Sequence, residues 1–338
     1  YFPEKGPVKE QFPVIFQYTP YGRAYIVPDQ RWWTKLMIWY ATGTSGPVLD
    51  RANSTNTVYG SDKEMIKRFL AHGYIYVCAD VRGTGASYGT KTDFMPEIAK
   101  DGYDLITWIE NQNWSNGKVG MFGGSYLGYT QLVTAGKKPK ALKAIFPEVV
   151  PMDGYTGEIR PGGIFLWAYS QQDLQAYLEH NFHLPDEGFY PTAPVIDEDQ
   201  DGDLSDEIPL DKNGNGSFLD DYAYPDDPND PPQYPDGKKR DHIYYLATYE
   251  HKSNRPYSSI GPKTVFIDTL VEWDKDSPGS SSKATPYEAG PAHSIPSIME
   301  SGIAIYNHGG WMDPFIRGTI EIYRDSIRPS GIQLPTIP

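Results

Sequence analysis

The chain has 338 residues and a formal net charge of −14, with 39% hydrophobic and 14% aromatic residues. This composition supports a sizeable core in one large domain or two ordinary ones, and it excludes global disorder. No apolar run approaches the roughly 18 residues that a membrane span needs, and no basic face offsets the acidic charge, which disfavours nucleic acid as a partner.

The first half of the chain alternates short apolar runs with amphipathic stretches. We expect strands at 14–18, 74–79, 118–122 and 142–146, and helices at 61–72, 98–111 and 126–135. Such alternation is typical of a parallel sheet with helices on both faces. The single cysteine, Cys78, lies in the second apolar run and is predicted to be a buried core thiol. Residues 1–150 are therefore expected to form the first part of an α/β core.

After residue 150 the alternation breaks. We expect one long helix over 163–180 and then a loop-rich segment, dense in Pro, Gly, Asp and Tyr, up to about residue 296. A strand at 303–306 and a helix at 314–327 resume the pattern. An irregular insertion of this kind predicts a cap over the carboxyl edge of the sheet, where such folds place their sites. The expected division is a cap at 151–296 and a second part of the core at 297–338.

The segment Gly123-Gly124-Ser125-Tyr126 lies between an expected strand and an expected helix. A serine on such a sharp turn is held in a strained backbone conformation, and the turn lifts its hydroxyl above the sheet at the amino end of the helix. In the usual Gly-x-Ser-x-Gly pattern the second glycine comes one residue earlier than Gly128 does here. The turn predicts Ser125 as a nucleophile, with an ordinary glycine-rich loop as the alternative.

Residues 108–155 closely resemble the superfamily of cocaine esterases, α-amino-acid ester hydrolases and X-prolyl dipeptidyl-peptidases, whose turn reads Gly-x-Ser-Tyr-x-Gly. Further matching pieces occur in the superfamily's order at 19–21, 80–87, 108–114 and 310–313. The resemblance implies an α/β-hydrolase core with an inserted helical, loop-rich cap. It also implies a serine hydrolase that cleaves an ester or amide, of the acyl-ester or X-prolyl peptide type, through an acyl-enzyme. The C-terminal β-sandwich of the superfamily has no counterpart in this chain.

The remaining catalytic groups follow from the turn and from the resemblance. The backbone N–H after the nucleophile, that of Tyr126, is an oxyanion donor by the geometry of the turn. The resemblance implies that the Tyr21 hydroxyl is the second donor and that Asp313 is the acid of the triad. Plainer interpretations stay open, because Tyr21 is one of 26 tyrosines and Asp313 precedes Pro314 as a helix N-cap would.

No histidine follows Asp313, although this fold orders its triad as serine, acid and histidine. The seven histidines are His72, His180, His183, His242, His251, His293 and His308. We therefore expect the base on sequence beyond residue 338, with His308 as the weaker internal candidate. The alternative function is a catalytically incomplete hydrolase-fold binding module stabilised by calcium.

Substrate preference is only partly indicated. Superfamily members that take α-amino-acid esters carry acidic residues just after the triad acid, where this chain has Pro314, Phe315 and Ile316, so that activity is in doubt. Trp311 and Trp167 predict an apolar acyl pocket for a small-molecule ester, an amide or a short peptide. A second copy of the chain, or a C-terminal segment absent from it, is the other expected partner.

The negative charge is concentrated in one segment. Positions 197–236 hold 14 acidic residues and one base, and so account for −13 of the net −14. From Asp197, oxygen-bearing side chains fall at loop positions 1, 3 and 5 with Gly202 at position 6, and a partial copy begins 14 residues later at Asp211. This spacing is typical of calcium loops.

The segment 197–221 departs from a full EF-hand, because Ile208 and Tyr222 occupy the positions of the usual glutamate. The candidate ligands are Asp197, Asp199, Asp201, Asp203, Asp206, Glu207, Asp211, Asn213, Asn215, Ser217, Asp220 and Asp221. We expect one or two structural Ca²⁺ ions in the cap, and no cofactor for catalysis. Weak calcium loops are usually extracellular, which predicts secretion or a periplasmic location; a solvated acidic loop is the alternative.

Overall fold

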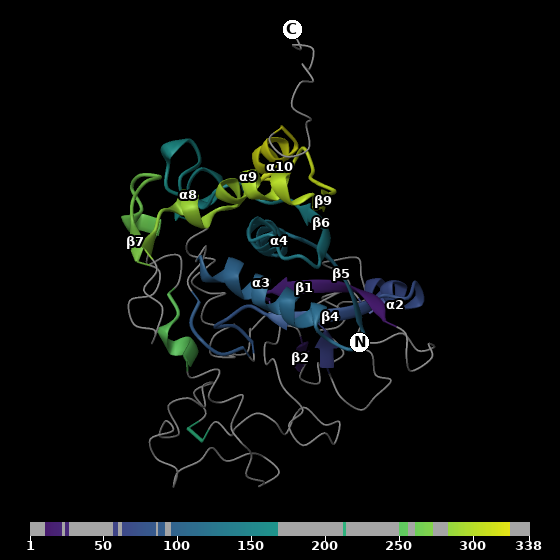
Figure 1. Cartoon of the computed structure of the whole chain (residues 1–338). Coiled ribbons are helices and arrows are strands. Elements are labelled where there is room, and N and C mark those ends of the chain that lie inside the picture. Colours follow the sequence, from purple (N-terminus) through teal and green to yellow (C-terminus); the bar gives the residue numbers. More distant parts are fainter. Residues whose placement is uncertain are drawn as a thin grey trace, which may run out of the picture.

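The computed structural model describes residues 11–21, 24–26, 57–59, 63–85, 87–91, 96–167, 212–213, 250–255, 261–272 and 283–324. Within these residues the centre of the fold is a five-stranded sheet in the order β4-β1-β5-β6-β9, and every neighbouring pair is parallel (Figure 1). Its strands are β1 (Phe12–Thr19), β4 (Ile75–Asp80), β5 (Ser115–Gly124), β6 (Leu142–Glu148) and β9 (Ala304–Ile305).

The carboxyl ends of the long strands meet at one edge of the sheet. Thr19 at the end of β1 pairs with Asp80 at the end of β4, and Gly124 at the end of β5 pairs with Glu148 at the end of β6. Because β5 is the central strand, whatever follows Gly124 is placed in the middle of that edge. Ligand sites in open parallel sheets lie at this edge.

Helices cover both faces of the sheet. Helices α3 (Glu97–Glu110) and α4 (Tyr126–Gly136) pack on one face, where the Thr130 hydroxyl donates to the Tyr18 carbonyl at 2.9 Å. Helix α2 (Lys63–Ala71) lies on the other face, with the Phe69 ring 5.1 Å from the Phe122 ring. Met121 points into the core between the sheet and helices α3 and α4. Because successive strand residues point to opposite faces, Phe122 lies on the face that α2 covers.

Helix α9 (Pro291–Ser301) extends the α3–α4 layer, and Figure 1 shows α4 between α3 and α9. The Ala292 N–H donates to the Met152 carbonyl at 2.7 Å, and Lys138 after α4 pairs with Glu300 of α9. The helix therefore crosses residue 296, where the cap was expected to end, and packs as part of the core.

Shorter elements complete the described residues. Two antiparallel pairs occur, one of β2 (Ala24–Ile26) with β3 (Thr57–Tyr59) and one of β7 (Val271–Glu272) with β8 (Lys283–Ala284). The remaining helices are η1 (Tyr155–Ile159), η2 (Pro161–Gly163), η3 (His251–Ser253), η4 (Gly261–Lys263), α8 (Pro286–Ala289) and α10 (Ile316–Ile322).

One core cluster runs through the sheet and the α3–α4 layer. It includes Phe16, Ile98, Ile106, Leu132 and Ile145, each at most 2% exposed. Burying one such side chain contributes about 1.5–3 kcal/mol, so this cluster fixes the sheet on which the site stands.

The structure confirms the α/β-hydrolase core and the predicted strands and first three helices to within about three residues. Two details differ. Cys78 is half-buried rather than buried, with its sulfur 3.9 Å from the Gln17 Oε1. The expected helix over 163–180 is wrong at its start, because η2 ends at Gly163 and residues 164–166 are not helical; its residues from 168 lie outside the described ones.

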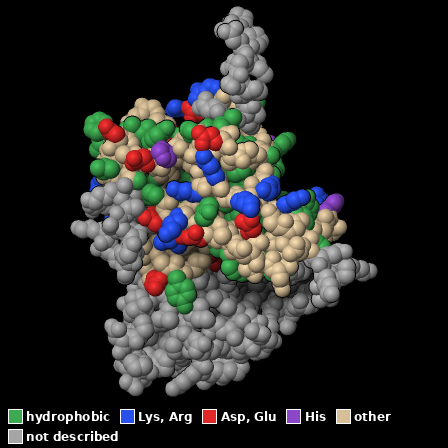
Figure 2. All heavy atoms as spheres, in the orientation of Figure 1, with side chains coloured by type: hydrophobic (Ala, Val, Ile, Leu, Met, Phe, Trp, Pro, Cys, Tyr) green, Lys and Arg blue, Asp and Glu red, His purple; other side chains and the backbone are tan. Residues whose placement is uncertain are grey.

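The surface of the described residues agrees with the charge distribution of the sequence. On the face shown in Figure 2, Lys and Arg side chains are interspersed with Asp and Glu side chains. None of the helices in the described ranges is both long enough and apolar enough to cross a bilayer.

Candidate active site

The turn between β5 and α4 has the geometry of a nucleophile elbow. Strand β5 ends at Gly124 and α4 begins at Tyr126, so Ser125 alone makes the junction, with φ 55° and ψ −125°. A non-glycine residue in this conformation is strained, by about 1–3 kcal/mol. The surrounding hydrogen bonds offset that strain, because the Ser125 N–H donates to the Glu148 carbonyl at 2.9 Å and the Ser125 carbonyl accepts from Gly128 N–H at 2.9 Å.

The late glycine of the motif has a structural reason. A Cβ on Gly128 would lie 2.1 Å from Cγ2 of Val150 and 3.2 Å from the carbonyl oxygen of Glu148. The first turn of α4 therefore runs directly against the chain that follows β6. Only glycine permits that approach, which is why the glycine stands three residues after Ser125.

Tyr21 faces Ser125 from the neighbouring strand. It follows β1, where its N–H donates to Oγ1 of Thr19 at 3.1 Å, and its hydroxyl lies 3.4 Å from Oγ of Ser125. Although 40% of the Tyr21 surface is exposed, desolvation of its hydroxyl end raises the pKa of Tyr21. Hydrogen bonds to the Ser125 side chain and the Tyr126 backbone N–H act in the opposite direction and lower it. Tyr21 is therefore protonated at neutral pH and can donate.

These contacts bring three predicted residues together. The Tyr21 hydroxyl and the Tyr126 N–H are hydrogen-bonding neighbours, and both adjoin the Ser125 hydroxyl. Two donors that converge beside a serine hydroxyl could hold an oxygen that becomes negative during acyl transfer. The aromatic ring of Tyr126 is directed into the protein, where it packs edge-to-face on Tyr129 with ring centroids 5.1 Å apart.

Asp313 lies at the same end of the sheet but farther along it. Its Oδ1 accepts from the Phe315 N–H at 2.7 Å, in the turn between β9 and α10. The N-cap of α10 is Phe315, so the expected N-cap role of Asp313 is wrong by two residues. Strand β9 is two strands from β5, which is about 10 Å across a sheet. A third group, such as an imidazole, would have to lie between Asp313 and Ser125 for the two to act together.

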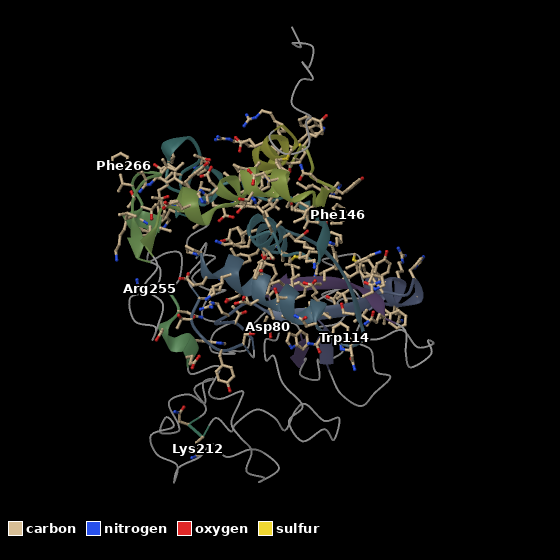
Figure 3. The ribbon with its side chains drawn as sticks, in the orientation of Figure 1. Asp80, Trp114, Phe146, Lys212, Arg255 and Phe266 are labelled. Carbon is tan, nitrogen blue, oxygen red and sulfur yellow. The ribbon has the colours of Figure 1, made fainter. Side chains whose placement is uncertain are left out.

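None of the histidines that the structure describes is hydrogen-bonded to Ser125. His308 Nδ1 lies 2.8 Å from Glu148 Oε1, and its ring is 6.1 Å from the ring of Phe146. Phe146 is labelled on β6 in Figure 3. His72 contacts the Arg68 carbonyl and His251 contacts the Ser87 carbonyl, while His293 packs on the ring of Tyr287. His180, His183 and His242 lie outside the described residues.

The two tryptophans expected to form an acyl pocket are exposed. Trp311 is 83% exposed and Trp167 is 63% exposed, with its ring 6.2 Å from the Phe165 ring. The pocket itself stays a prediction.

The calcium loops also stay a prediction. Of the twelve candidate ligands only Asn213 is described, as an exposed residue in a bend, and the other eleven lie outside the described residues. In the ranges that the structure does describe, no group of three or more His, Cys, Asp or Glu side chains could hold a metal ion.

A loop after β4 approaches the site and was not predicted to do so. It begins at Asp80, which is 3% exposed and marks the end of β4 in Figure 3, and Ser87 Oγ donates to the Asp80 carbonyl at 2.8 Å. Arg82 braces it through two hydrogen bonds to Asp101 of α3. At its far end Lys91 Nζ lies 5.1 Å from the centre of the Tyr126 ring. No sequence signal distinguished Lys91 from a solvated surface lysine.

Comparisons with known proteins indicate the family to which the chain belongs. The family model described as X-Pro dipeptidyl-peptidase (S15 family) matches residues 1–335. A Mycobacterium bovis protein provisionally named a serine esterase is 26% identical over 275 residues, which cover 75% of this chain and 37% of that protein. Cocaine esterase of Rhodococcus sp. is 42% identical over 98 residues, which cover 28% of this chain and 17% of that enzyme.

A solved structure is similar as well. The CocE/NonD family hydrolase of Staphylococcus aureus is 26% identical with a TM-score of 0.38, and the match covers 57% of this chain and 35% of that one. The chain spans little more than a third of the length of the curated relatives first matched. The match over residues 1–335, carried on an α/β-hydrolase core, shows that the chain belongs to the X-Pro dipeptidyl-peptidase (S15) family.

Proposed function

We propose that this chain carries the nucleophile and the oxyanion hole of a serine hydrolase that cleaves an ester or amide bond through an acyl-enzyme. The observation that carries the proposal is the strained Ser125, with φ 55° and its Oγ 3.4 Å from the Tyr21 hydroxyl. Relatives named serine esterase, cocaine esterase and Xaa-Pro dipeptidyl-peptidase support a substrate that is a small ester, an amide or a short peptide.

In the proposed reaction, Ser125 Oγ attacks the substrate carbonyl carbon while a general base takes its proton. The carbonyl oxygen becomes negative and is held by the Tyr21 hydroxyl and the Tyr126 N–H. Collapse of this intermediate breaks the carbon–oxygen or carbon–nitrogen bond, and the base returns the proton to the leaving alcohol or amine. Water then attacks the acyl-enzyme by the same steps, which releases the acid and restores Ser125.

The proposed base is a histidine oriented by Asp313. Because β9 is two strands from β5, a group such as an imidazole would have to bridge the two side chains. His308 is a poorer candidate, because its Nδ1 is directed at Glu148. The proposal therefore places the base on a segment outside the described residues.

One observation favours a second function, a binding module on a hydrolase scaffold. That observation is the engagement of His308 with Glu148, which leaves no described histidine on Ser125. Structural Ca²⁺ in the acidic segment and an extracellular or periplasmic location would fit either function, and both are proposed from the sequence alone.

A fluorophosphonate probe on the full-length protein tests the two functions against each other. We expect covalent labelling at Ser125, located by peptide mass spectrometry, and no labelling of the Ser125→Ala variant. Ser253→Ala, at an exposed serine of η3, is the matched control and should label like the wild type. A folded wild type that does not label would contradict the hydrolase function and support the binding module.

A further inference from the structure

A positive charge lies beside the oxyanion hole. The Lys91 ammonium is 5.1 Å from the centre of the Tyr126 ring, and Tyr126 supplies the backbone donor of the hole. An ammonium over an aromatic face is attracted by the ring, by about 0.5–2 kcal/mol. The ring is itself fixed by its edge-to-face contact with Tyr129. The charge is therefore held at a defined place next to the nucleophile elbow.

The main chain fixes Lys91 independently of its ammonium. The Lys91 N–H donates to Asn254 Oδ1, and its carbonyl accepts from the Arg255 N–H at 3.1 Å. Asn254 is 6% exposed and also donates to the Gly83 carbonyl at 2.7 Å. Figure 3 shows Arg255 on the segment that carries these contacts. A substitution of the Lys91 side chain leaves all of these backbone contacts in place.

The positive charge of Lys91 favours negative charge at the Tyr21 oxygen, which is the direction that an oxyanion hole needs. Lys91 lowers the pKa of Tyr21, and the buried carboxylate of Glu158 opposes it with a smaller effect. A cation that lowers the pKa of Tyr21 also makes its hydroxyl a stronger hydrogen-bond donor to a negative substrate oxygen. The effect of the charge therefore reaches the substrate through the Tyr21 hydroxyl.

We propose that Lys91 is a positioning residue of the oxyanion hole, whose ammonium acts through Tyr21 to stabilise the negative oxygen that forms when Ser125 attacks the substrate. The inference rests on the proposed acyl-transfer function and goes beyond it, because it assigns a role in the reaction to a side chain that does not touch the nucleophile. An uncharged residue at position 91 should slow the formation of the acyl-enzyme without weakening the binding of a neutral substrate.

The test uses the full-length protein with p-nitrophenyl acetate as a neutral substrate and a fluorophosphonate as a second readout. We expect Lys91→Met to lower kcat and the labelling rate about tenfold, the effect of one pKa unit of charge stabilisation, with KM within about twofold. Lys91→Arg, which keeps the charge, should retain most of the rate. Lys118→Met removes an exposed lysine at the opposite end of β5 and should match the wild type.

A Tyr21→Phe background tests the route of the effect. Because the hydroxyl is then absent, Lys91→Met should cost less than about threefold there. Equal losses in both backgrounds, an unchanged kcat in Lys91→Met, or a Lys91→Arg variant as slow as Lys91→Met would each overturn the inference. Thermal melts verify folding, and Lys91→Gln replaces Lys91→Met if the latter melts early. An unlabelled wild type would refute the hydrolase function itself, whereas a labelled wild type with an equally labelled Lys91→Met refutes only the role of Lys91.

Discussion

The N–H of Ser125 donates to the carbonyl oxygen of Glu148 at 2.9 Å, so the last residue of β6 holds the proposed nucleophile that follows β5. The same Glu148 binds His308 through its side chain at 2.8 Å. The carboxyl ends of three neighbouring strands are thus linked at one point. The elbow depends on the strand beside it as much as on its own turn.

Gly128→Ala should disrupt the elbow. The added Cβ would meet Val150 Cγ2 at 2.1 Å, and such overpacking costs about 1–3 kcal/mol. The expected fall in Tm is roughly 2–4 °C for each kcal/mol in a domain of this size, together with slower labelling of Ser125. The matched control for stability is Gly310→Ala, where nothing lies within 4 Å of the added Cβ. Equal melting of the two variants would show that this contact can relax.

Tyr21→Phe should slow the labelling of Ser125 without unfolding the protein. Loss of one oxyanion donor typically costs about 10²–10³ in rate, whereas the phenyl ring still fills the same space. The measurement is the second-order rate of fluorophosphonate labelling. Tyr103→Phe removes a hydroxyl from a partly exposed tyrosine of α3 and should keep the wild-type rate. A Tyr21→Phe protein that labels at the wild-type rate would remove Tyr21 from the site.

The contribution of the Arg82–Asp101 pair to stability should depend on the planar guanidinium, which makes two hydrogen bonds to one carboxylate. Two guanidinium nitrogens donate to the two carboxylate oxygens, and Asp101 also accepts from the Tyr18 hydroxyl at 3.5 Å. Both side chains are partly exposed, at 28% and 21%, so solvent screening limits the pair to about 1 kcal/mol. We expect the Arg82→Lys variant to lose most of this stabilisation, measured as the free energy of urea unfolding, because an ammonium cannot make both hydrogen bonds. Stability equal to the wild type would mean that charge alone suffices.

Stability should fall at alkaline pH. Burial raises the pKa of Tyr18, with the nearby Asp101 charge adding to the effect, and burial also raises the pKa of Tyr21. An unfolded tyrosine titrates near pH 10. The free energy of unfolding is therefore unaffected by these tyrosines below about pH 10, and it falls as the pH rises further, because only the unfolded state then releases the protons. Urea unfolding at several pH values from 8.5 to 11 measures this loss. Tyr18→Phe should flatten the slope, and an identical slope in the variant would contradict the assignment.

Chelation should lower the Tm if the acidic segment binds calcium. An ion that binds only the folded state stabilises it by mass action, so EDTA should shift the melt downward and added Ca²⁺ should restore it. An Asp199→Asn/Asp201→Asn variant is expected to melt at the same temperature with and without EDTA. A wild-type midpoint that EDTA leaves unchanged would favour a solvated acidic loop.

The sequence predicted the central sheet well, because period and turn residues are local signals. The first three helices and the strands around them alternate cleanly along the chain. The start of the helix expected from residue 163 is wrong for a local reason as well, since Gly163 adopts a φ of 85° and residues 164–166 are not helical. Helix α9 was missed because Pro291 and Pro296 resemble loop residues, although Pro291 is at its first position.

The candidate site shows the same difference between local signals, which the sequence carries, and tertiary contacts, which it does not. Ser125 was predictable because a strained turn needs small neighbours at fixed offsets. The roles proposed for Tyr21 and Asp313 rest on a family resemblance, since a tyrosine or an aspartate carries no local mark of such a role. The place of Lys91 beside Tyr126 could not be predicted from the sequence, because it comes from tertiary contacts with Asn254 and Arg255.

Those contacts can form only late in synthesis, because their residues are far apart in the sequence. Asn254 follows Lys91 by 163 residues, yet it fixes the loop that borders the proposed oxyanion hole. At about 5–20 residues per second, a ribosome needs roughly 8–30 s to cover that distance. The nucleophile elbow can form earlier, because Ser125 depends first on β5, α4 and β6. The nascent chain therefore carries its proposed nucleophile for many seconds before the neighbouring loop is fixed in place.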